Sequence, residues 1–310
     1  MSPATPLENL AVGIDLGGTA TRFVAVDSRE QVRARRIVGT PRSGNLEQLR
    51  RFINQNVRTI TEGGQILSIG IGASGPIDAD GVIQNPDTLP AFTGVDLLPG
   101  IEREFHRRPA IDNDAVTAAL GEARFGAGRS NPNMLMVTLG TGIGVCLLQH
   151  GQPLRAADGS HPEAGHLSIN GPDAPCYCGR STCWEQVASR RALQDAATGL
   201  FDDARDSSED IDRASQLAST GDSAAIEMFA NYGRRLADGL SNLIAAYGAN
   251  FVVIGGSGSN YLPSYGRALR ERLLDIQECF PIPIVGAQLG EDGGAIGAAL
   301  LGRDATVAGH

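Results

Sequence analysis

The chain has 310 residues, a net charge of −9 and 42% hydrophobic residues, which favours a folded, soluble protein with two domains. The acidic balance excludes nucleic acid as the main partner, because binding to phosphates needs a basic surface. No stretch supplies the ~20 apolar residues of a membrane span, and the N-terminus lacks a signal-peptide pattern. We therefore expect a cytoplasmic protein that does not bind membranes, in a compartment that keeps cysteines reduced.

A Gly-rich turn joins the first two predicted strands, residues 10–14 and 22–26. Its glycines let backbone amides approach a phosphate, a neighbouring threonine adds a hydroxyl donor, and an aspartate at the strand end could hold Mg²⁺ through water. An ordinary tight hairpin turn is the alternative. The residues concerned are Asp15, Gly17, Gly18 and Thr19.

A predicted helix over Leu46–Ile60 precedes a buried strand over residues 66–72, which ends at Ser74 and Gly75. Residues 77–100 are rich in Pro, Gly and Asp and predict a long loop of the kind that lines a site.

A short strand, Pro109–Asp112, runs directly into Asn113 and Asp114 and then into a helix over Ala115–Phe125. Asp114 therefore lies at a strand end beside a helix N-terminus, where a carboxylate can be exposed and aimed at a substrate. A simple Asx N-cap explains the same pair equally well.

The pattern of apolar strand, Gly/Thr turn and apolar strand occurs a second time. Met134–Leu139 and Val145–Leu148 flank a turn that contains Gly140, Thr141 and Gly142. Two such turns indicate two related half-molecules, each of which could bind a different part of one polyphosphate. Cys146, in the middle of a strand, is expected to be a small buried residue.

One imidazole and three thiols lie close together in a Gly- and Pro-rich segment, and form a set suited to a structural Zn²⁺ ion. The residues are His166, Cys176, Cys178 and Cys183. Buried thiols without a metal are the alternative. Glu163 and Glu185 flank these residues, and two carboxylates held by a metal loop could accept hydrogen bonds from the hydroxyls of a sugar or other polyol. Otherwise both are solvated surface acids.

The remainder predicts an α/β domain. Residues 186–225 suggest helices with polar connections, and Ile226–Tyr247 a long amphipathic helix with one apolar stripe: Ile226, Phe229, Leu236, Leu240, Ile244 and Tyr247. A strand over Phe251–Ile254 ends in a third Gly-rich junction, with Gly255, Gly256 and Ser257. A helix over Pro263–Leu274, a strand over Ile282–Val285 and a helix over Gly293–Leu301 follow.

In this order, these motifs closely resemble the ROK family of sugar kinases and repressors over about residues 10–302. The motifs are Asp15–Thr19, Asn113-Asp114, Gly140–Gly144, Glu163–His166, Cys176–Glu185 and Gly255–Gly258. The Cys-x-Cys-Gly-x₄-Cys-x-Glu loop is specific to that family, whereas the Gly turns are not. The resemblance implies an actin-like/hexokinase (ribonuclease H-like) α/β fold with a cleft between two domains, here residues 1–117 plus about 291–310, and 118–290.

The resemblance also implies roles for these residues. ATP would bind at both Gly turns and at Gly255–Ser257, with Asp114 as the general base. The sugar would be held by Ser74, Gly75, Asn113, Asp114, Glu163, His166 and Glu185, with His166 also ligating zinc. A homodimer is expected.

The chain departs from the family pattern at Ser74, Val145, Cys146 and Thr182, which leaves the sugar open: glucose, N-acetylmannosamine, allose, or a polyol such as a cyclitol. Which hydroxyl accepts the phosphate, and whether polyphosphate replaces ATP, are also open. A sugar-sensing ROK repressor and a non-catalytic zinc-stabilised binding protein are the alternatives to a kinase. Only 14 residues precede Asp15, too few for the repressors' DNA-binding domain, and the retained Asp114 disfavours the third hypothesis.

Overall fold

A computed structural model describes residues 9–201, 209–276 and 282–308, in two compact units. The first unit contains the chain up to Pro132, Leu148–Pro162 and the residues from Gln288 onward, and the second contains Asn133–Leu147 and Glu163–Ala287. Among the described helices, none has the length and apolar character that crossing a membrane requires.

The first unit is built on a five-stranded sheet with strand order β3-β2-β1-β4-β5. Its strands are β1 (Leu10–Leu16), β2 (Ala20–Val26), β3 (Val32–Gly39), β4 (Ile66–Ala73) and β5 (Ala110–Asn113). β1, β2 and β3 pair antiparallel, whereas β4 and β5 run parallel to β1. Parallel strands end at the same sheet edge, which brings the segments after β1, β4 and β5 together.

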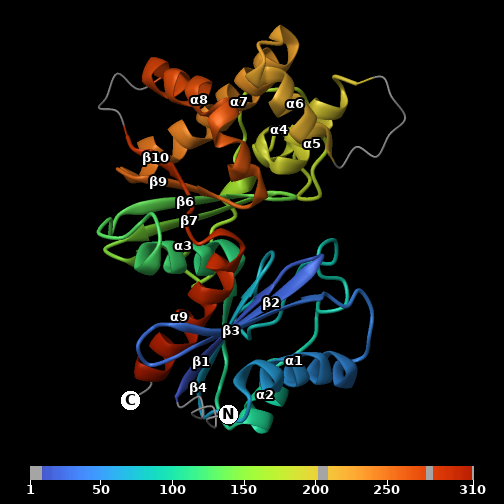
Figure 1. Cartoon of the computed structure of the whole chain (residues 1–310), viewed down its shortest axis with the longest axis vertical. Helices are drawn as coiled ribbons and strands as arrows, with labels where there is room; N and C mark the ends of the chain where they lie inside the picture. The colour runs from blue at the N-terminus through green and yellow to red at the C-terminus, as the bar shows by residue number, and fades with distance from the viewer. Residues whose placement is uncertain (1–8, 202–208, 277–281, 309–310) are drawn as a thin grey trace, which may run out of the picture. The chain divides into compact units, whose positions relative to one another are not determined.

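Helices cover both faces of this sheet (Figure 1). On one face α1 (Leu46–Thr61) and α2 (Leu98–Phe105) enclose an apolar core with Leu49, Ile53 and Phe92. On the other lies α9 (Gly293–Ala308), which also packs against α3 (Asp114–Phe125). This arrangement explains why β1 and β4 are apolar along almost their whole length.

Helix α9 approaches the sheet at glycine positions. A Cβ on Gly13 of β1 would collide with the backbone of Ala295, and one on Gly70 of β4 with that of Ala298. A Cβ on Gly297 would likewise strike the backbone of α3 at Thr117. Contacts with rigid backbone atoms cannot be relieved by rotating a side chain, so these glycines determine how closely the layers pack.

The second unit contains four strands: β6 (Met134–Leu139), most of β7 (Ile143–Gln149), β9 (Val252–Gly255) and β10 (Ile284–Gly286). The short β8 (Gln152–Pro153) completes the sheet, whose order is β10-β9-β6-β7-β8. The helices of this unit are α4 (Glu185–Ala188), α5 (Arg190–Thr198), α6 (Asp210–Ser219), α7 (Ser223–Tyr247) and α8 (Leu262–Ile276). It also has the short 3₁₀ turns η1 (Ala164–His166) and η3 (Ser257–Tyr261), whereas the 3₁₀ turn η4 (Gly290–Asp292) belongs to the first unit.

The two sheets share one topology. Read from the other edge, the second sheet is β8-β7-β6-β9-β10, which matches β3-β2-β1-β4-β5 strand for strand in chain order. The hairpins β1–β2 and β6–β7 occupy corresponding places, and each contains one of the two Gly turns. The predicted pair of related half-molecules is therefore confirmed at the level of strand order.

Most predicted elements occur close to their predicted bounds, but several details differ. β3 and α2 were not predicted, and on the long helix α7 Ile226 and Tyr247 are 46% and 42% exposed rather than buried in the stripe. Ile226 is exposed although Ala225 and Met228 on either side of it are buried, so its side chain points away from the core, and Tyr247 is the last residue of α7. The predicted domain boundary near residue 117 falls inside α3, which belongs to the first unit because it packs on α9.

We predict that Gly13→Ala destabilises the protein by about 1–3 kcal/mol, because the added methyl group overpacks the contact between β1 and α9. Thermal unfolding measures the effect as a fall in Tm of roughly 3 °C or more. Gly39→Ala is the matched control, since a Cβ at Gly39 has no atom within 4 Å. Equal Tm values for the two variants would contradict the close contact.

Candidate functional site

The first Gly turn, between β1 and β2, is fixed by two threonines from elsewhere in the first unit. The Thr40 hydroxyl donates to the Gly17 carbonyl at 2.6 Å, and the Thr40 amide donates to the Thr19 carbonyl at 3.1 Å. Thr88 covers Gly18, where a Cβ would lie 2.6 Å from Thr88 Cγ2. The turn is therefore fixed by contacts from Thr40 and Thr88, while its two glycines carry no side chains that would cover the backbone amides.

Asp15 and Asp114 form a pair of interacting, partly buried carboxyl groups in the first unit. Burial, together with the neighbouring charge of Asp114, raises the pKa of Asp15 to about 7, although Arg22 opposes both effects. The Asp15 carboxyl group also lies against Gly294, in the first turn of α9. Burial likewise raises the pKa of Asp114, while a hydrogen bond from Ser74 favours its charged form. Such paired carboxyls with raised pKa values are common at functional sites.

Asn113, not Asp114, is the N-cap of α3. Its Oδ1 accepts from the Ala115 amide at 2.8 Å, and its Nδ2 donates to the Gly75 carbonyl at 3.2 Å. The simple capping explanation thus applies to Asn113. Asp114 is the first residue of the helix, where the helix dipole favours a negative charge.

Two further side chains support this edge of the sheet. Asn85 Nδ2 donates to the Ser74 carbonyl at 3.0 Å and packs on Gly75, which has a φ of 92°. The Arg155 guanidinium forms a two-pronged ion pair with the buried Asp112 carboxylate, one place before Asn113. The segments that follow β4 and β5 are therefore tied to side chains distant in the sequence.

In the second unit, the loop between β6 and β7 touches Glu185. A Cβ on Gly142 would lie 2.4 Å from Glu185 Oε2, so a larger residue there would displace this carboxylate. The third Gly-rich junction, after β9, packs on the end of β6: Gly256 has a φ of 71°, and a Cβ there would lie 2.6 Å from the Leu139 carbonyl oxygen. Glycine is required at Gly256 by its φ and by the backbone contact, whereas at Gly142 it leaves the Glu185 carboxylate in its place.

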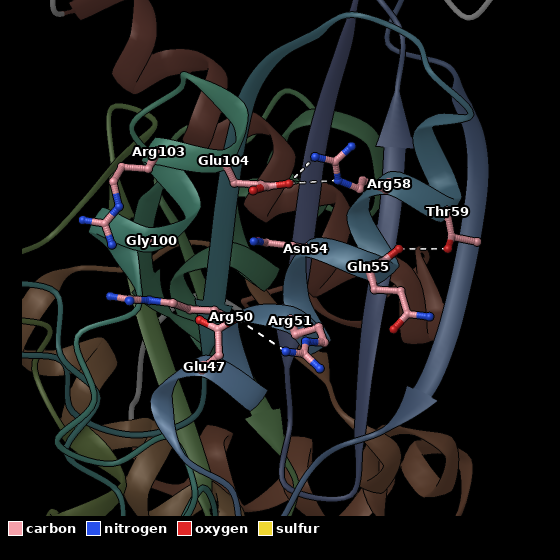
Figure 2. A pocket seen from close by; sticks show the side chains of 10 residues that line it. All are labelled: Glu47, Arg50, Arg51, Asn54, Gln55, Arg58, Thr59, Gly100, Arg103 and Glu104. Carbon is pink, nitrogen blue, oxygen red and sulfur yellow. Dashed lines mark hydrogen bonds and ion pairs between the residues drawn. The ribbon is translucent and has the colours of Figure 1, made fainter.

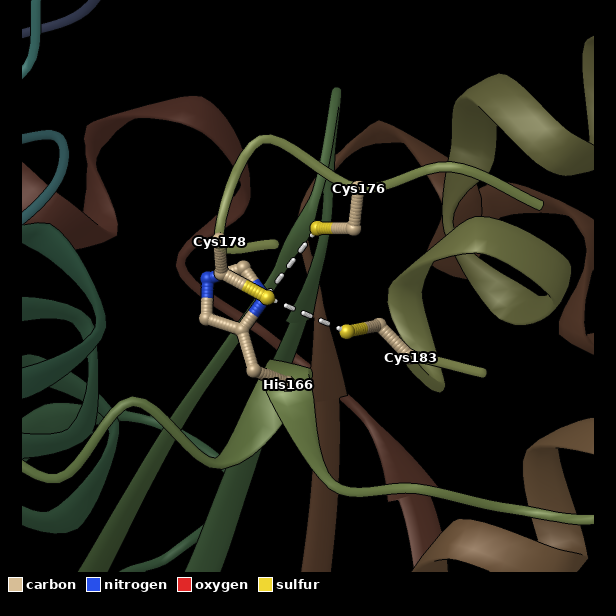
Figure 3. A group of neighbouring side chains, drawn as sticks. All are labelled: His166, Cys176, Cys178 and Cys183. Carbon is tan, nitrogen blue, oxygen red and sulfur yellow. Dashed lines mark hydrogen bonds between the residues drawn. The ribbon is translucent and has the colours of Figure 1, made fainter. Parts of the chain in front are cut away.

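The four predicted metal ligands come together in the second unit (Figure 3). One ligand atom from each of His166, Cys176, Cys178 and Cys183 lies within 4.8 Å of all the others. Cys176 Sγ is 3.5 Å from His166 Nδ1, and Cys178 Sγ is 3.4 Å from Cys183 Sγ. Ligands of a tetrahedral zinc ion, with bonds of about 2.0–2.3 Å, lie roughly 3.3–3.8 Å apart. The cluster therefore has the donor types and spacing to hold such an ion.

An aromatic anchor fixes the same loop independently of any metal. Trp184, between Cys183 and Glu185, is fully buried, and its Nε1 donates to the Arg235 carbonyl on α7 at 3.1 Å. The indole packs on Gly239 so closely that a Cβ there would collide with the ring. Burial of an indole contributes as much to the stability of the fold as burial of any other core side chain.

Glu185 and Glu163, the two carboxylates predicted to bind a sugar, occupy different environments. Glu185 is buried at the start of α4, with Oε1 3.3 Å from Cys176 Sγ and 3.4 Å from His166 Nδ1. Glu163 is exposed and lies directly before η1. Glu185 is thus closer to the metal ligands than the sequence suggested, because α4 begins immediately beside them.

A separate polar hollow of about 760 Å³ lies over α1 and α2 of the first unit (Figure 2). It is lined by Arg50, Arg58, Arg103, Asn54 and Glu104, among others, and Arg58 is paired with Glu104. It contains none of the predicted site residues.

Comparison with known proteins identifies the family. The ROK family model matches residues 11–305. The chain belongs to the ROK family. Among curated relatives, the glucokinase of Thermotoga maritima is 30% identical over 305 residues, covering 94% of this chain and 96% of that protein. The N-acetyl-D-glucosamine kinase of Pectobacterium atrosepticum is 31% identical over 303 residues, covering 93% and 97%.

Solved structures of ROK proteins share the fold. The ROK hexokinase of Thermus thermophilus aligns with a TM-score of 0.83 at 30% identity, covering 96% of this chain and 99% of that one. The ROK glucokinase of Streptomyces griseus, solved with glucose and AMPPNP, aligns with a TM-score of 0.78 at 29% identity, covering 95% and 99%. The actin-like sugar kinase fold expected from the motifs is therefore confirmed for this ROK chain.

The structure brings together residues that the sequence motifs singled out. Asp15 and Asp114 interact in the first unit, and the four predicted metal ligands converge in the second. The motifs did not reveal Thr40, Thr88, Asn85, Arg155 or Tyr177, which contact these residues. Only Tyr177 carried a local signal, since it stands between two of the predicted ligands.

We predict that Asp15→Asn stabilises the protein at high pH. Because the pKa of Asp15 is raised from 3.8 to about 7, the folded state binds this proton more tightly than the unfolded chain does, so the wild type loses stability as pH rises through that window. In buffer without divalent cations, the Tm of the variant relative to the wild type should therefore rise between pH 4 and pH 8. Asp87→Asn, at an exposed position, is the control. A difference in Tm that does not change with pH would refute the raised pKa.

Proposed function

We propose that this ROK protein is an ATP-dependent sugar kinase that phosphorylates a hydroxyl of a hexose or related sugar. Relatives matched over nearly their whole length are named as kinases of glucose and N-acetylglucosamine, and a structural neighbour was solved with glucose and an ATP analogue. The observation that carries the proposal is Asp114, a carboxylate on the first turn of α3 whose pKa burial raises toward that of an effective base.

Asp114 is proposed as the general base. Its carboxylate would accept the proton of the sugar hydroxyl while that oxygen bonds to the γ-phosphorus and the bond from phosphorus to the ADP oxygen breaks. Ser74 keeps the carboxylate oriented through its hydrogen bond. Asn113 holds the helix start in place through its cap and its bond to Gly75.

The two Gly turns and the junction after β9 are proposed to bind ATP. Backbone amides in the turns at Gly17–Thr19 and Gly140–Gly142 would donate to phosphate oxygens, and Gly255–Ser257 would contribute to the nucleotide pocket. Asp15 is proposed to hold Mg²⁺, and this cation, when bound, would neutralise charge on the phosphates. A bound cation would also relieve the cost of ionising Asp15 beside Asp114.

In the second unit, Glu163, His166 and Glu185 are proposed to accept or donate hydrogen bonds to sugar hydroxyls. Ser74, Gly75, Asn113 and Asp114 of the first unit are proposed to bind the same sugar. A structural Zn²⁺ on His166 and the three cysteines would hold the first group in position. Among sugars, the relatives favour glucose and N-acetylhexosamines as first candidates.

We predict that Asp114→Asn retains the fold but lowers kcat about 10²–10⁴-fold, the usual contribution of a positioned base. ADP release and formation of the sugar phosphate should be measured over a panel of glucose, mannose, allose, N-acetylglucosamine and N-acetylmannosamine. In the wild type, kcat/KM should fall on the acid side at a higher pH than for an ordinary aspartate, because the pKa of Asp114 is raised. Near-normal turnover in the variant would exclude Asp114 as the base, and a wild type that phosphorylates nothing would refute the kinase proposal.

We predict that Cys178→Ser lowers bound zinc and Tm together, because it removes one of four ligands. Zinc content by inductively coupled plasma mass spectrometry and thermal unfolding measure the two effects. Cys146→Ser, at a buried cysteine outside the cluster, should keep its zinc whatever its Tm. Undiminished zinc in Cys178→Ser would show that the proposed ligand set is wrong.

A further inference from the structure

Tyr177 is held over the metal cluster by its position in the chain. It lies between Cys176 and Cys178, and the surrounding turn is closed by hydrogen bonds from the Cys176 amide to the Arg180 carbonyl and from the Gly179 amide to the Cys176 carbonyl. Its hydroxyl is 2.9 Å from His166 Nε2, and the two rings meet edge-on with centroids 5.0 Å apart. Even so, 69% of the residue is exposed, so one side of the ring is open to a ligand.

The donor of the hydrogen bond between His166 and Tyr177 follows from the role of the imidazole as a metal ligand. His166 Nδ1 is the nitrogen near Cys176 Sγ, and the other ring nitrogen faces away from the sulfurs (Figure 3). An imidazole that ligates a metal through Nδ1 carries its proton on Nε2. His166 Nε2 then donates to the Tyr177 oxygen, which leaves the Tyr177 O–H as a donor for another group.

The surroundings of Tyr177 identify that group. Glu185 lies against the same imidazole, with its Oε1 3.4 Å from His166 Nδ1, and Glu163 stands three residues before His166 in the chain. The phenol therefore shares His166 with one of the two carboxylates proposed to bind the sugar, and the other carboxylate belongs to the same segment of chain as His166. A polyol hydroxyl placed among these residues would meet one phenol donor and two carboxylate acceptors.

We propose that Tyr177 is a sugar-binding residue that determines specificity, and this inference rests on the proposed kinase function. Its hydroxyl occupies the hydrogen-bonding position on His166 Nε2 that a sugar hydroxyl would otherwise use. This refines the role proposed for His166 above, because the imidazole would then act on the sugar through the Tyr177 hydroxyl. Its ring would then stand beside the bound sugar, where a hydroxyl needs less room than an N-acetyl group. If Cys176 and Cys178 both hold the proposed zinc ion, the backbone of Tyr177 would be kept from moving away to make room.

The alternative is that Tyr177 only orients His166 toward the metal, as residues behind metal ligands commonly do. Two variants separate the roles. Tyr177→Phe removes the hydroxyl and keeps the ring, whereas Tyr177→Ala removes both. Tyr247→Phe, at an exposed tyrosine on α7, is the matched control. Zinc content is measured for every variant, and binding of a hexose and its N-acetyl derivative (glucose with N-acetylglucosamine, mannose with N-acetylmannosamine) is measured by titration calorimetry.

Tyr177→Phe should weaken hexose binding roughly 2- to 10-fold at unchanged zinc content, the effect of one hydrogen bond. Tyr177→Ala should shift the ratio of hexose to N-acetylhexosamine affinity about tenfold toward the N-acetyl sugar, because a space replaces the ring. Unchanged affinities and ratio in both variants would overturn the inference, as would losses of affinity that parallel loss of zinc. In either case a wild type that still phosphorylates sugar would leave the kinase proposal intact. A wild type that binds no sugar would overturn both.

Discussion

The second unit depends on the convergence of one imidazole and three thiols in a loop that has little apolar surface of its own. The ligand atoms of His166, Cys176, Cys178 and Cys183 lie within 4.8 Å of one another. Three thiols this close together would resist ionising, because their negative charges would repel one another. A bound divalent cation would favour the ionised form. Every group proposed to bind the sugar in this unit lies on or beside the cluster.

The loop is nevertheless held in two different ways. Its C-terminal part is fixed by Trp184, which is buried on α7, so Glu185 keeps its place beside Gly142 by apolar packing. The part that includes Tyr177 is exposed and is closed mainly by short-range hydrogen bonds and the ligands themselves. If the proposed zinc ion is bound, its removal should therefore displace Tyr177 further than Glu185. In the first unit, side-chain contacts of Thr40, Asn85 and Arg155 tie the loops to the sheet.

The sequence was most informative where function requires residues that are close in the chain. The Gly turns, the Asn113-Asp114 pair and the cysteine spacing all predicted features that the structure contains, and the repeated strand-turn-strand pattern predicted the shared sheet topology. Thr40, Thr88 and Asn85 could not be predicted, because their partners are distant in sequence and many threonines and asparagines have no such role. β3 was missed because its exposed arginines hide the alternation typical of a strand. The exposure of Ile226, between the buried Ala225 and Met228, and of Tyr247, the last residue of α7, depends on how the helix faces the core.

The central claim is that a metal-bound loop presents the sugar-binding residues of this ROK protein. A crystal structure of the protein with a sugar that it phosphorylates, recorded at the zinc absorption edge, tests it most directly. The account predicts an anomalous peak within bonding distance of His166 Nδ1 and the three cysteine sulfurs, and sugar hydroxyls within hydrogen-bonding distance of Glu185 and Tyr177. A cluster without zinc, or a sugar bound away from this loop, would contradict it.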